Sequence, residues 1–337
     1  MVELIEHISA ETDPSHGKVP RDRTMAERMQ LGIIPINKPC GPSSHEVGAW
    51  VQRLTGAIKA GHSGTLDPQV SGVLPVALDD ATKALTFMLK SDKEYVGIMR
   101  FHRAVDAARV RRLFAEHVGK IKQLPPVRSA VKRVQREREI YVLELLELDG
   151  RDALFHVSCE AGTYIRKLCH DLGRSAGTGA NMVELRRTRA AGFSEVQCCT
   201  LQQLSDALWL WKERGDESEL RKYVLQPEQV LKFKRIIIVD GAIEALCAGA
   251  QLALPGVAKF EKGIARNETV MLLSLKGEMV AIGAALMSEK EMKEGTKGLA
   301  VKTVRVVMRA GTYPRLWKKH EGSVHDGEEG RTSEKDG

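Results

Sequence analysis

The stretch GHSGTLDPQVSG, residues 61–72, combines three glycines, a histidine and an Asp-Pro pair between two apolar segments of the chain. The glycines permit close backbone approach and positive φ, while Pro68 disfavours the α region for Asp67 and holds that residue extended. The Asp67 carboxylate is therefore expected to project from a stiff turn. An Asp-Pro pair among glycines is most often a plain turn former. One carboxylate with no second acid, metal-ligand cluster or phosphate loop nevertheless fits nucleophilic catalysis better than hydrolysis by paired acids.

Regular elements are predicted on both sides of this loop. The run LGIIPINKP at 31–39 predicts a strand, and the capping-box spacing of Ser43 and Glu46 predicts a helix after it. Downstream, EYVGIMRFH at 94–102 is apolar on both faces, which is typical of a strand in the middle of a sheet. The dipeptide DG at 149–150 joins two strand-like runs and is a strong hairpin signal. The chain therefore mixes helices with strands, and at least two of the strands form a hairpin.

The domain organisation follows from changes in this pattern. The first thirty residues are polar, with a net charge of −2 and no sustained apolar period, so they are expected to form an arm rather than a core element. A polar stretch precedes Pro227, and beyond it short strands with glycine-containing turns predict a small barrel. The predicted parts are a partly disordered arm at 1–30, a main domain at 31–228, a barrel at 232–310 and a disordered tail at 318–337.

Composition narrows the class of protein. With 337 residues, 43% of them hydrophobic and 28% charged, the chain has an ordinary globular composition, which excludes a disordered or fibrous protein. Six scattered cysteines include no C-x-x-C pair, which favours reduced thiols over disulfides and predicts no structural metal. There is no long apolar run and no signal-peptide pattern, so a soluble intracellular protein with no membrane association is expected.

The positive charge is concentrated in one part of the chain. The net charge is +7, but residues 98–140 alone contain 12 Lys and Arg against 4 Asp and Glu, a local excess of +8. A basic run is more often a solvated charged face than a binding site. A loop this basic and this poor in apolar residues is nevertheless suited to following phosphates along a nucleic acid. The predicted RNA-binding residues are Arg128, Lys132, Arg133 and Arg136.

Four spaced motifs together resemble the tRNA pseudouridine synthase B family over about residues 31–225: GHSGTLDP (61–68), KEYVGIMRFH (93–102), GTYIRKLCHDLG (162–173) and ELRRTR (184–189). Three more segments resemble the dyskerin-type branch, the catalytic subunits of H/ACA guide-RNA particles: INKPCGPSSHEV (36–47), PPVRSAVKR (125–133) and TYPRLW (312–317). The segment 232–310 resembles a PUA domain, an RNA-binding barrel. The resemblance implies an α+β fold, with a mixed or antiparallel sheet in the catalytic domain and a C-terminal small β-barrel.

The resemblance also implies a reaction. A uridine isomerase breaks the bond from the base to ribose carbon 1, rotates the uracil and rejoins it through carbon 5. Asp67 matches the family's nucleophile, and Arg166 matches the arginine that holds this carboxylate charged and oriented. Tyr95 matches the aromatic residue that stacks on the base and is suited to a later proton step. Whether Asp67 attacks the sugar or the base stays open. Such an isomerisation needs no cofactor and no metal.

A base inside a duplex is out of reach, so the target nucleotide must be flipped into a pocket. His62 matches the residue that supports the flipped nucleotide, and Tyr95, Tyr164 and Leu185 match the family's pocket positions. Taken one at a time, these residues have ordinary interpretations as half-buried aromatics, a core leucine or a loop histidine. Their joint occurrence in the family's order favours the catalytic interpretation.

Members of the dyskerin-type branch depend on partners. The resemblance implies an H/ACA guide RNA, a target rRNA or tRNA, and three small proteins: a zinc- or hairpin-containing subunit, a glycine- and arginine-associated subunit near a thumb loop, and a kink-turn binder. The thumb corresponds to the basic loop at 122–139. The chain lacks the long lysine-rich extensions of eukaryotic members, which favours an archaeal, cytoplasmic protein over a nucleolar one. Two alternatives are a standalone tRNA pseudouridine synthase that needs no guide and a non-catalytic RNA-binding scaffold.

Overall fold

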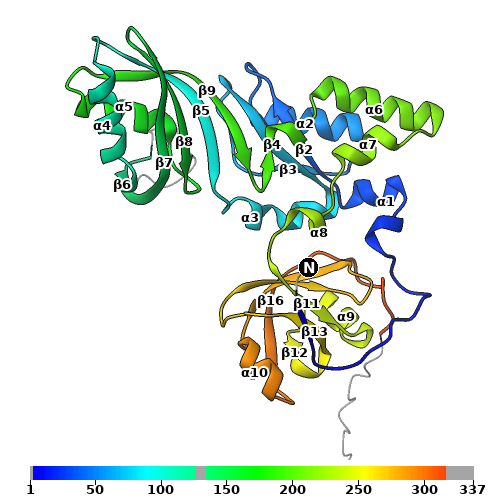
Figure 1. Cartoon of the computed structure of the whole chain (residues 1–337). Coiled ribbons are helices and arrows are strands. Elements are labelled where there is room, and N and C mark those ends of the chain that lie inside the picture. The colour runs from blue at the N-terminus through cyan, green and yellow to red at the C-terminus, as the bar shows by residue number, and fades with distance from the viewer. Residues whose placement is uncertain (1–2, 126–133, 316–337) are drawn as a thin grey trace, which may run out of the picture.

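The computed structural model describes residues 3–125 and 134–315, and its elements form two bodies, each built on a curved sheet (Figure 1). The larger body contains nine strands. They are β2 (Ile33–Lys38), β3 (Ala60–His62), β4 (Val70–Leu78), β5 (Lys93–Phe101), β6 (Gly119–Gln123), β7 (Arg136–Asp149), β8 (Asp152–Cys159), β9 (Ala180–Ala190) and β10 (Phe193–Ser194). The main path runs in the order β2-β4-β9-β5-β8-β7-β6, with β3 beside β4 and β10 beside β9.

This sheet confirms the α+β fold and several local predictions. The pairing is antiparallel except between β4 and β9, so the sheet is mixed. Strand β5 is fourth of the seven strands in the main path and pairs with β9 on one side and β8 on the other, which confirms its central position. The DG dipeptide closes the β7–β8 hairpin, where Asp149 pairs with Asp152. Most residues of β5 on both faces of the sheet are buried or half-buried, as its apolar composition predicts.

Helices lie at both ends of this sheet. In Figure 1, α4 and α5 lie on the side of β7 and β8, while α2, α6 and α7 lie on the side of β2 and β4. The helices of the larger body are α1 (Met25–Gln30), α2 (Ser44–Thr55), α3 (Leu85–Met88), α4 (Ala107–Glu116), α5 (Ile165–Ser175), α6 (Leu201–Arg214), α7 (Ser218–Tyr223) and α8 (Pro227–Val230). The predicted capping box at Ser43 and Glu46 is confirmed at the start of α2. Single 3₁₀ turns lie at η1 (Pro20–Asp22), η2 (Asp79–Ala84) and η3 (Glu195–Gln197).

The smaller body is a second mixed sheet in the order β1-β13-β11-β14-β15-β16-β12, curled around its own apolar core. Its elements are β1 (Leu4–Glu6), β11 (Lys234–Ile238), α9 (Asp240–Cys247), β12 (Leu252–Ala253), η4 (Leu254–Gly256), β13 (Val257–Glu261), β14 (Thr269–Leu273), β15 (Met279–Ala285), α10 (Glu289–Glu294) and β16 (Leu299–Val306). The predicted tail at 318–337 lies outside the described residues.

The expectation that residues 1–30 form an arm outside the core is wrong for the described part of that segment. Strand β1 pairs with β13 across most of the chain's length, with Leu4 opposite Glu261. Helix α1 buries Met25 and Met29 in the core of the larger body. A capping box of Thr24 and Glu27 opens α1, and its spacing is the signal that could have revealed the helix. A six-residue helix with three buried residues, one of them an arginine, shows too little apolar periodicity for the sequence pattern to detect.

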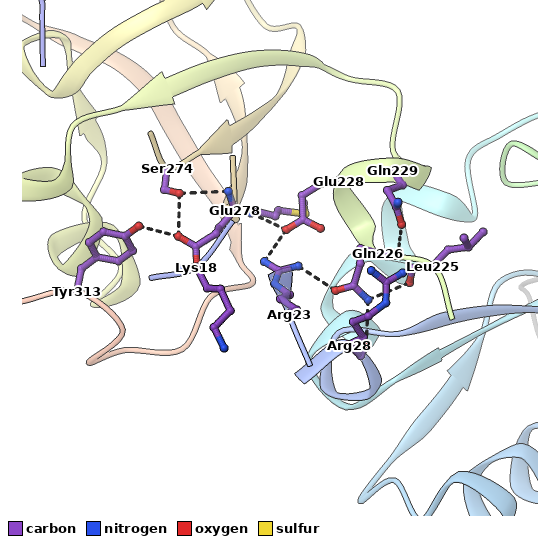
Figure 2. A network of polar contacts seen from close by, with 11 residues as sticks. Lys18, Arg23, Arg28, Leu225, Gln226, Glu228, Gln229, Ser274, Glu278 and Tyr313 are labelled. Atoms are coloured by element: carbon purple, nitrogen blue, oxygen red, sulfur yellow. Dashed lines mark hydrogen bonds and ion pairs between the residues drawn. The ribbon is translucent and has the colours of Figure 1, made fainter. Parts of the chain in front are cut away.

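The two bodies share an apolar contact surface. One core cluster combines residues of the larger sheet, such as Val73, with residues of the smaller one, such as Met271 and Ile282. Phe87 and Phe233 meet edge to face with ring centroids 5.9 Å apart. Polar contacts run beside this surface, from Tyr313 and Glu278 through Glu228 to Gln226 (Figure 2). The position of the smaller body is thus set by direct packing as well as by the chain connection.

Candidate active site

Two buried side chains hold the backbone of the Asp67 loop. The Oγ of Ser44, in the first turn of α2, accepts from the Leu66 N–H at 2.8 Å and donates to the Leu66 carbonyl at 3.0 Å. The Nζ of Lys38, at the end of β2, donates to the carbonyls of Pro68 and Val70 at 3.1 and 2.8 Å. Both side chains are fully buried. The loop is therefore tied to the sheet and to a helix on either side of Asp67, as the predicted stiff turn requires.

The Asp67 carboxylate forms an ion pair with the guanidinium of Arg166, in the first turn of α5. Both side chains are about half exposed, at 51% for Asp67 and 57% for Arg166. The pair is therefore open to a large substrate. A charge-assisted hydrogen bond of this kind fixes the orientation of the carboxylate. The sequence-predicted partners are thus brought together from positions 99 residues apart.

A buried glutamine fixes the start of α5. The side-chain carbonyl of Gln123 accepts from the Tyr164 N–H at 3.0 Å, and its amide donates to the Tyr164 carbonyl at 3.2 Å. Gln123 is 2% exposed and is the last residue of β6. Tyr164 is half-buried and is the N-cap of α5, without a side-chain cap of its own. These two bonds therefore determine where the first turn of α5 presents Arg166.

Tyr95 lies on β5 directly opposite Arg187 of β9. Tyr95 is 7% exposed and Arg187 is 1% exposed. The Arg187 guanidinium donates to the carbonyls of Val73 at 2.8 Å and Gly64 at 3.0 Å, which joins the sheet to the catalytic loop. Burial raises the pKa of the Tyr95 hydroxyl, and the nearby Arg187 charge acts in the opposite direction. The hydroxyl therefore stays protonated at neutral pH, available as a hydrogen-bond donor.

Leu185 and His62 lie on the strands that flank the same loop. Leu185 is buried on β9, opposite Val70 where β4 leaves the loop, and its side chain lies over Gly97. His62 ends β3, and its Nδ1 is buried without a hydrogen-bond partner. Burial, with smaller contributions from the charges of His45 and Arg187, lowers the pKa of the His62 imidazole. A neutral imidazole with one buried, unpartnered nitrogen thus lies beside the Asp67 loop.

Several residues of this arrangement were not found by sequence reasoning. The ELRRTR motif contains Arg187 but predicts no role for it, although it lies two residues after Leu185 and so on the same strand face. Lys38, Ser44 and Gln123 were also missed. Each acts through backbone groups of residues distant in sequence, and local spacing contains no sign of such a contact. Of the predicted RNA-binding residues, Arg136 is exposed at the start of β7. Arg128, Lys132 and Arg133 lie outside the described residues.

Comparison with known proteins identifies the family. Residues 52–165 match the TruB family pseudouridylate synthase N-terminal domain, and residues 166–232 match the tRNA pseudouridylate synthase B C-terminal domain. The chain belongs to the TruB family of pseudouridine synthases. This family consists of isomerases, so the protein is an enzyme of that class. Two further matches are a PUA domain at 234–307 and a DKCLD (NUC011) domain at 2–48.

Relatives in this family match nearly the whole chain. A "Probable tRNA pseudouridine synthase B" of Methanopyrus kandleri is 50% identical over 94% of both chains. One of Methanosarcina barkeri is 47% identical over 95% of both. A solved structure described as "Crystal Structure of a Cbf5-Nop10-Gar1 Complex" is 45% identical, covers 94% of this chain and 97% of that one, and has a TM-score of 0.86. Another, "Structure of H/ACA RNP bound to a substrate RNA containing 2'-deoxyuridine", is 43% identical over 94% and 98%, with a TM-score of 0.85.

Within residues 3–125 and 134–315, no three His, Cys, Asp or Glu side chains lie close enough together to hold a metal ion. No helix there is long and apolar enough to cross a membrane. The six cysteines are free, and three of them, Cys159, Cys169 and Cys199, are buried.

Proposed function

We propose that this TruB-family protein converts uridines of a guide-paired RNA to pseudouridine with Asp67 as the nucleophile. The observation that supports this most directly is the ion pair of Asp67 and Arg166 on a loop anchored from both sides. Arg166 orients the carboxylate, whose exposed side is open to the substrate. The catalytic body is taken as residues 31–228 and the RNA-binding barrel as residues 232–310.

The neighbouring side chains fit the remaining steps of the isomerisation. Tyr95, Tyr164 and Leu185 are proposed to form the apolar and aromatic walls that receive the flipped uracil. His62, neutral and with one buried, unpartnered ring nitrogen, is proposed to support the flipped nucleotide. The glycosidic bond breaks at N1, the base turns and C5 bonds to ribose carbon 1. The proton lost from C5 and the proton gained at N1 balance, so the isomerisation consumes no other reactant.

Guide dependence is proposed from the structural relatives. The two solved structures described above contain, by their own descriptions, H/ACA particle components: Nop10 and Gar1 in one, and a substrate RNA in the other. Both relatives match 94% of this chain at more than 40% identity. We propose an H/ACA guide RNA, its rRNA or tRNA target and small partner proteins for this chain too. The basic loop at 122–139 is proposed as the thumb that closes on RNA.

A standalone tRNA enzyme is the second candidate, because the sequence relatives carry the name tRNA pseudouridine synthase B. The test is to incubate the purified chain with tRNA alone, and then with a guide RNA, its target and the partner proteins. Pseudouridine is mapped in each product by base-specific chemical modification. Pseudouridine that forms only when the guide RNA is present supports the proposal. Efficient modification of tRNA without a guide, unchanged when the guide is added, would establish the second candidate instead.

The Asp67→Asn variant tests the nucleophile. The amide keeps the shape of the side chain but cannot attack, so pseudouridine formation should fall by at least about 1,000-fold. RNA affinity should stay within a few-fold of the parent, since one exposed carboxylate is lost among many phosphate contacts. Asp206→Asn, on the exposed face of α6, is the matched control with the same charge change. Turnover by Asp67→Asn at the rate of the control would exclude Asp67 as nucleophile.

A further inference from the structure

A cavity of about 400 Å³ lies away from the catalytic loop, where η1, α1, α7 and α8 meet. In Figure 1, α1 and α8 lie on the side of the larger body that faces the smaller one. The cavity is lined by Pro20, Arg21, Arg28, Arg221, Gln226 and Gln229. Three of these six residues are arginines, and we refer to it below as the arginine cavity.

Arg28 is the most unusual of these residues. Its side chain is 6% exposed, and one of its amino groups donates to the Val224 carbonyl at 2.9 Å. Its Nε–H is buried and has no hydrogen-bond partner. In the part of the chain that the structure describes, no ion pair includes Arg28 (Figure 2). A guanidinium stays protonated in proteins, so Arg28 is a buried positive charge without a carboxylate of its own.

The charged groups around Arg28 do not supply a negative partner for its guanidinium. Arg23 is bound to Glu228 at 2.9 Å, and Arg221 to Glu217 at 2.7 Å. Burial lowers the pKa of the Arg28 guanidinium, and the charges of Arg221 and Arg23 lower it further, against the weaker opposite effects of Glu217 and Glu228. A buried charge that lacks a partner is strongly unfavourable. Each nearby acid is already paired with another arginine, so an anion from outside the chain would remove the imbalance.

The geometry of the donors favours a phosphate group. Arg28 lines the arginine cavity with a guanidinium whose Nε–H has no partner in the protein, while Arg21 beside it is 86% exposed and can turn toward a ligand. Several guanidiniums around one site match the many acceptor oxygens of a phosphate. The cavity also lies beside the elements that join the two bodies, since α8 directly precedes β11 of the smaller one.

We propose that the arginine cavity binds a phosphate group of the RNA backbone through Arg28, Arg221 and Arg21. The choice of RNA as the source of the phosphate rests on the proposed function. The site would hold the RNA at the junction of the two bodies, separately from the thumb and from Asp67.

The first experiment uses inorganic phosphate and the full chain. Sodium phosphate is titrated against sodium chloride at equal ionic strength, and the thermal unfolding midpoint is measured. The parent should be raised by about 2 °C or more by phosphate beyond chloride. Arg28→Met, of similar length without charge, should lose this difference. Arg53→Met, an exposed arginine on α2, should retain it and corrects for the general stabilising effect of phosphate.

A second variant guards against misfolding of Arg28→Met. Arg21 is exposed and makes only a long contact of 3.6 Å with Asp22, so Arg21→Gln cannot disturb the core. It should lose part of the phosphate effect. Equal phosphate shifts in the parent, Arg28→Met, Arg21→Gln and Arg53→Met would overturn the proposal.

The second experiment identifies the source of the phosphate. The affinity for a guide RNA paired with its target is measured between 50 and 200 mM salt, a range over which phosphate contacts change affinity strongly. Arg28→Met should weaken binding about 3- to 10-fold and lower the slope of log Kd against log salt by about one, and Arg53→Met should do neither. Loss of the phosphate effect with unchanged RNA affinity and slope would overturn the RNA assignment in favour of a free phosphate compound. A parent that makes no pseudouridine would contradict the proposed function alone, because the phosphate titration does not depend on catalysis.

Discussion

Two buried cations lie next to Tyr95, and backbone carbonyls rather than carboxylates hold both of them. Arg187 donates to Val73 and Gly64, while the Nζ of Lys93 donates to the carbonyls of Leu89, at 2.8 Å, and Ser91. A carboxylate in this place would neutralise them. Carbonyl oxygens satisfy the N–H groups and leave the positive charge in place. The region around Tyr95 is therefore electropositive, which suits a substrate that carries phosphates.

Lys93 provides a pH test of this arrangement. Burial, with a smaller effect of the Arg187 charge, lowers the pKa of the Lys93 amine to about 8 from 10.5. Below pH 8 the amine is protonated in both states and its burial penalty is fully present. Between pH 8 and 10.5 the folded state has lost the proton while the unfolded state still binds it, so stability rises with pH. Relative to Lys93→Met, the parent should gain about 3 kcal/mol over this interval, measured by urea unfolding.

Lys90→Met is the control for this measurement, because Lys90 lies three residues earlier and is exposed. The difference between the parent and Lys90→Met should stay flat from pH 8 to 10.5. A flat curve for Lys93→Met as well would mean that the Lys93 amine is not desolvated in the folded protein.

At the scale of elements, the position of α5 decides whether the ion pair of Asp67 and Arg166 forms. The N-terminus of α5 is held by Gln123, and its C-terminal part lies against the start of β9. At Gly173 a Cβ atom would lie 2.1 Å from the backbone nitrogen of Ala180, so only glycine permits this approach. Two distant contacts, one at each end, therefore set the direction in which α5 presents Arg166.

The Gln123→Leu variant tests the N-terminal contact. It fills a similar volume but leaves the Tyr164 N–H without the Gln123 acceptor, while the Tyr164 carbonyl keeps its bond from the Leu168 N–H. The free energy of unfolding should therefore fall by about 1–3 kcal/mol. Single-turnover pseudouridine formation should fall more than RNA affinity does, because Arg166 loses its alignment with Asp67. Gln123→Glu retains an acceptor for the Tyr164 N–H and should recover part of the rate. Equal losses of rate and affinity in both variants would indicate a purely structural role.

A pair of glycine substitutions tests the C-terminal contact. Gly173→Ala must move α5 away from β9 and should destabilise the protein by about 1–3 kcal/mol or more. Gly48, inside α2, is the matched control: a Cβ there would meet only the His62 ring carbon, at 3.8 Å. Gly48→Ala should be neutral or stabilise by up to about 1 kcal/mol, because alanine is the better helix former. Thermal unfolding of both variants measures this, and equal midpoints would contradict the close packing of α5.

At the scale of the whole molecule, the N-terminal segment ties the two bodies together. Its first strand, β1, joins the smaller sheet, and the Lys18 N–H donates to Glu278 of the smaller body. The segment then ends in α1, which packs in the core of the larger body. Arg23 and Glu228 form an ion pair whose side chains are 7% and 9% exposed. Glu228 also accepts from the N–H of Met279, on β15. One carboxylate thus connects the N-terminal segment, α8 and the smaller body.

Breaking this pair should loosen the junction. Arg23→Met leaves the Glu228 carboxylate buried and uncompensated, which should cost about 3–5 kcal/mol. The double variant Arg23→Met, Glu228→Leu should recover much of that loss, because no lone charge remains. A double-mutant cycle in urea separates the two effects. If the single variants were each neutral, the pair would contribute nothing to holding the two bodies together.

The sequence alone determined the features that depend on near neighbours or on whole motifs. The helix start at Ser43, the 149–150 hairpin and the turn at Asp67 follow from residues within a few positions of one another. The central strand β5 follows from its apolar composition. The family motifs also predict Asp67 and Arg166 as partners, and the structure brings these two side chains together in an ion pair.

Only the tertiary structure decided which distant groups complete the site. The carbonyls that hold Lys38 and Arg187, the glutamine that fixes α5, and the pairing of β1 with β13 join segments far apart in the chain. The burial of Arg28 without a carboxylate belongs to the same class. A buried charge or amide is acceptable only where the fold brings it a partner, and that partner's distance in space has no regular relation to its distance along the sequence.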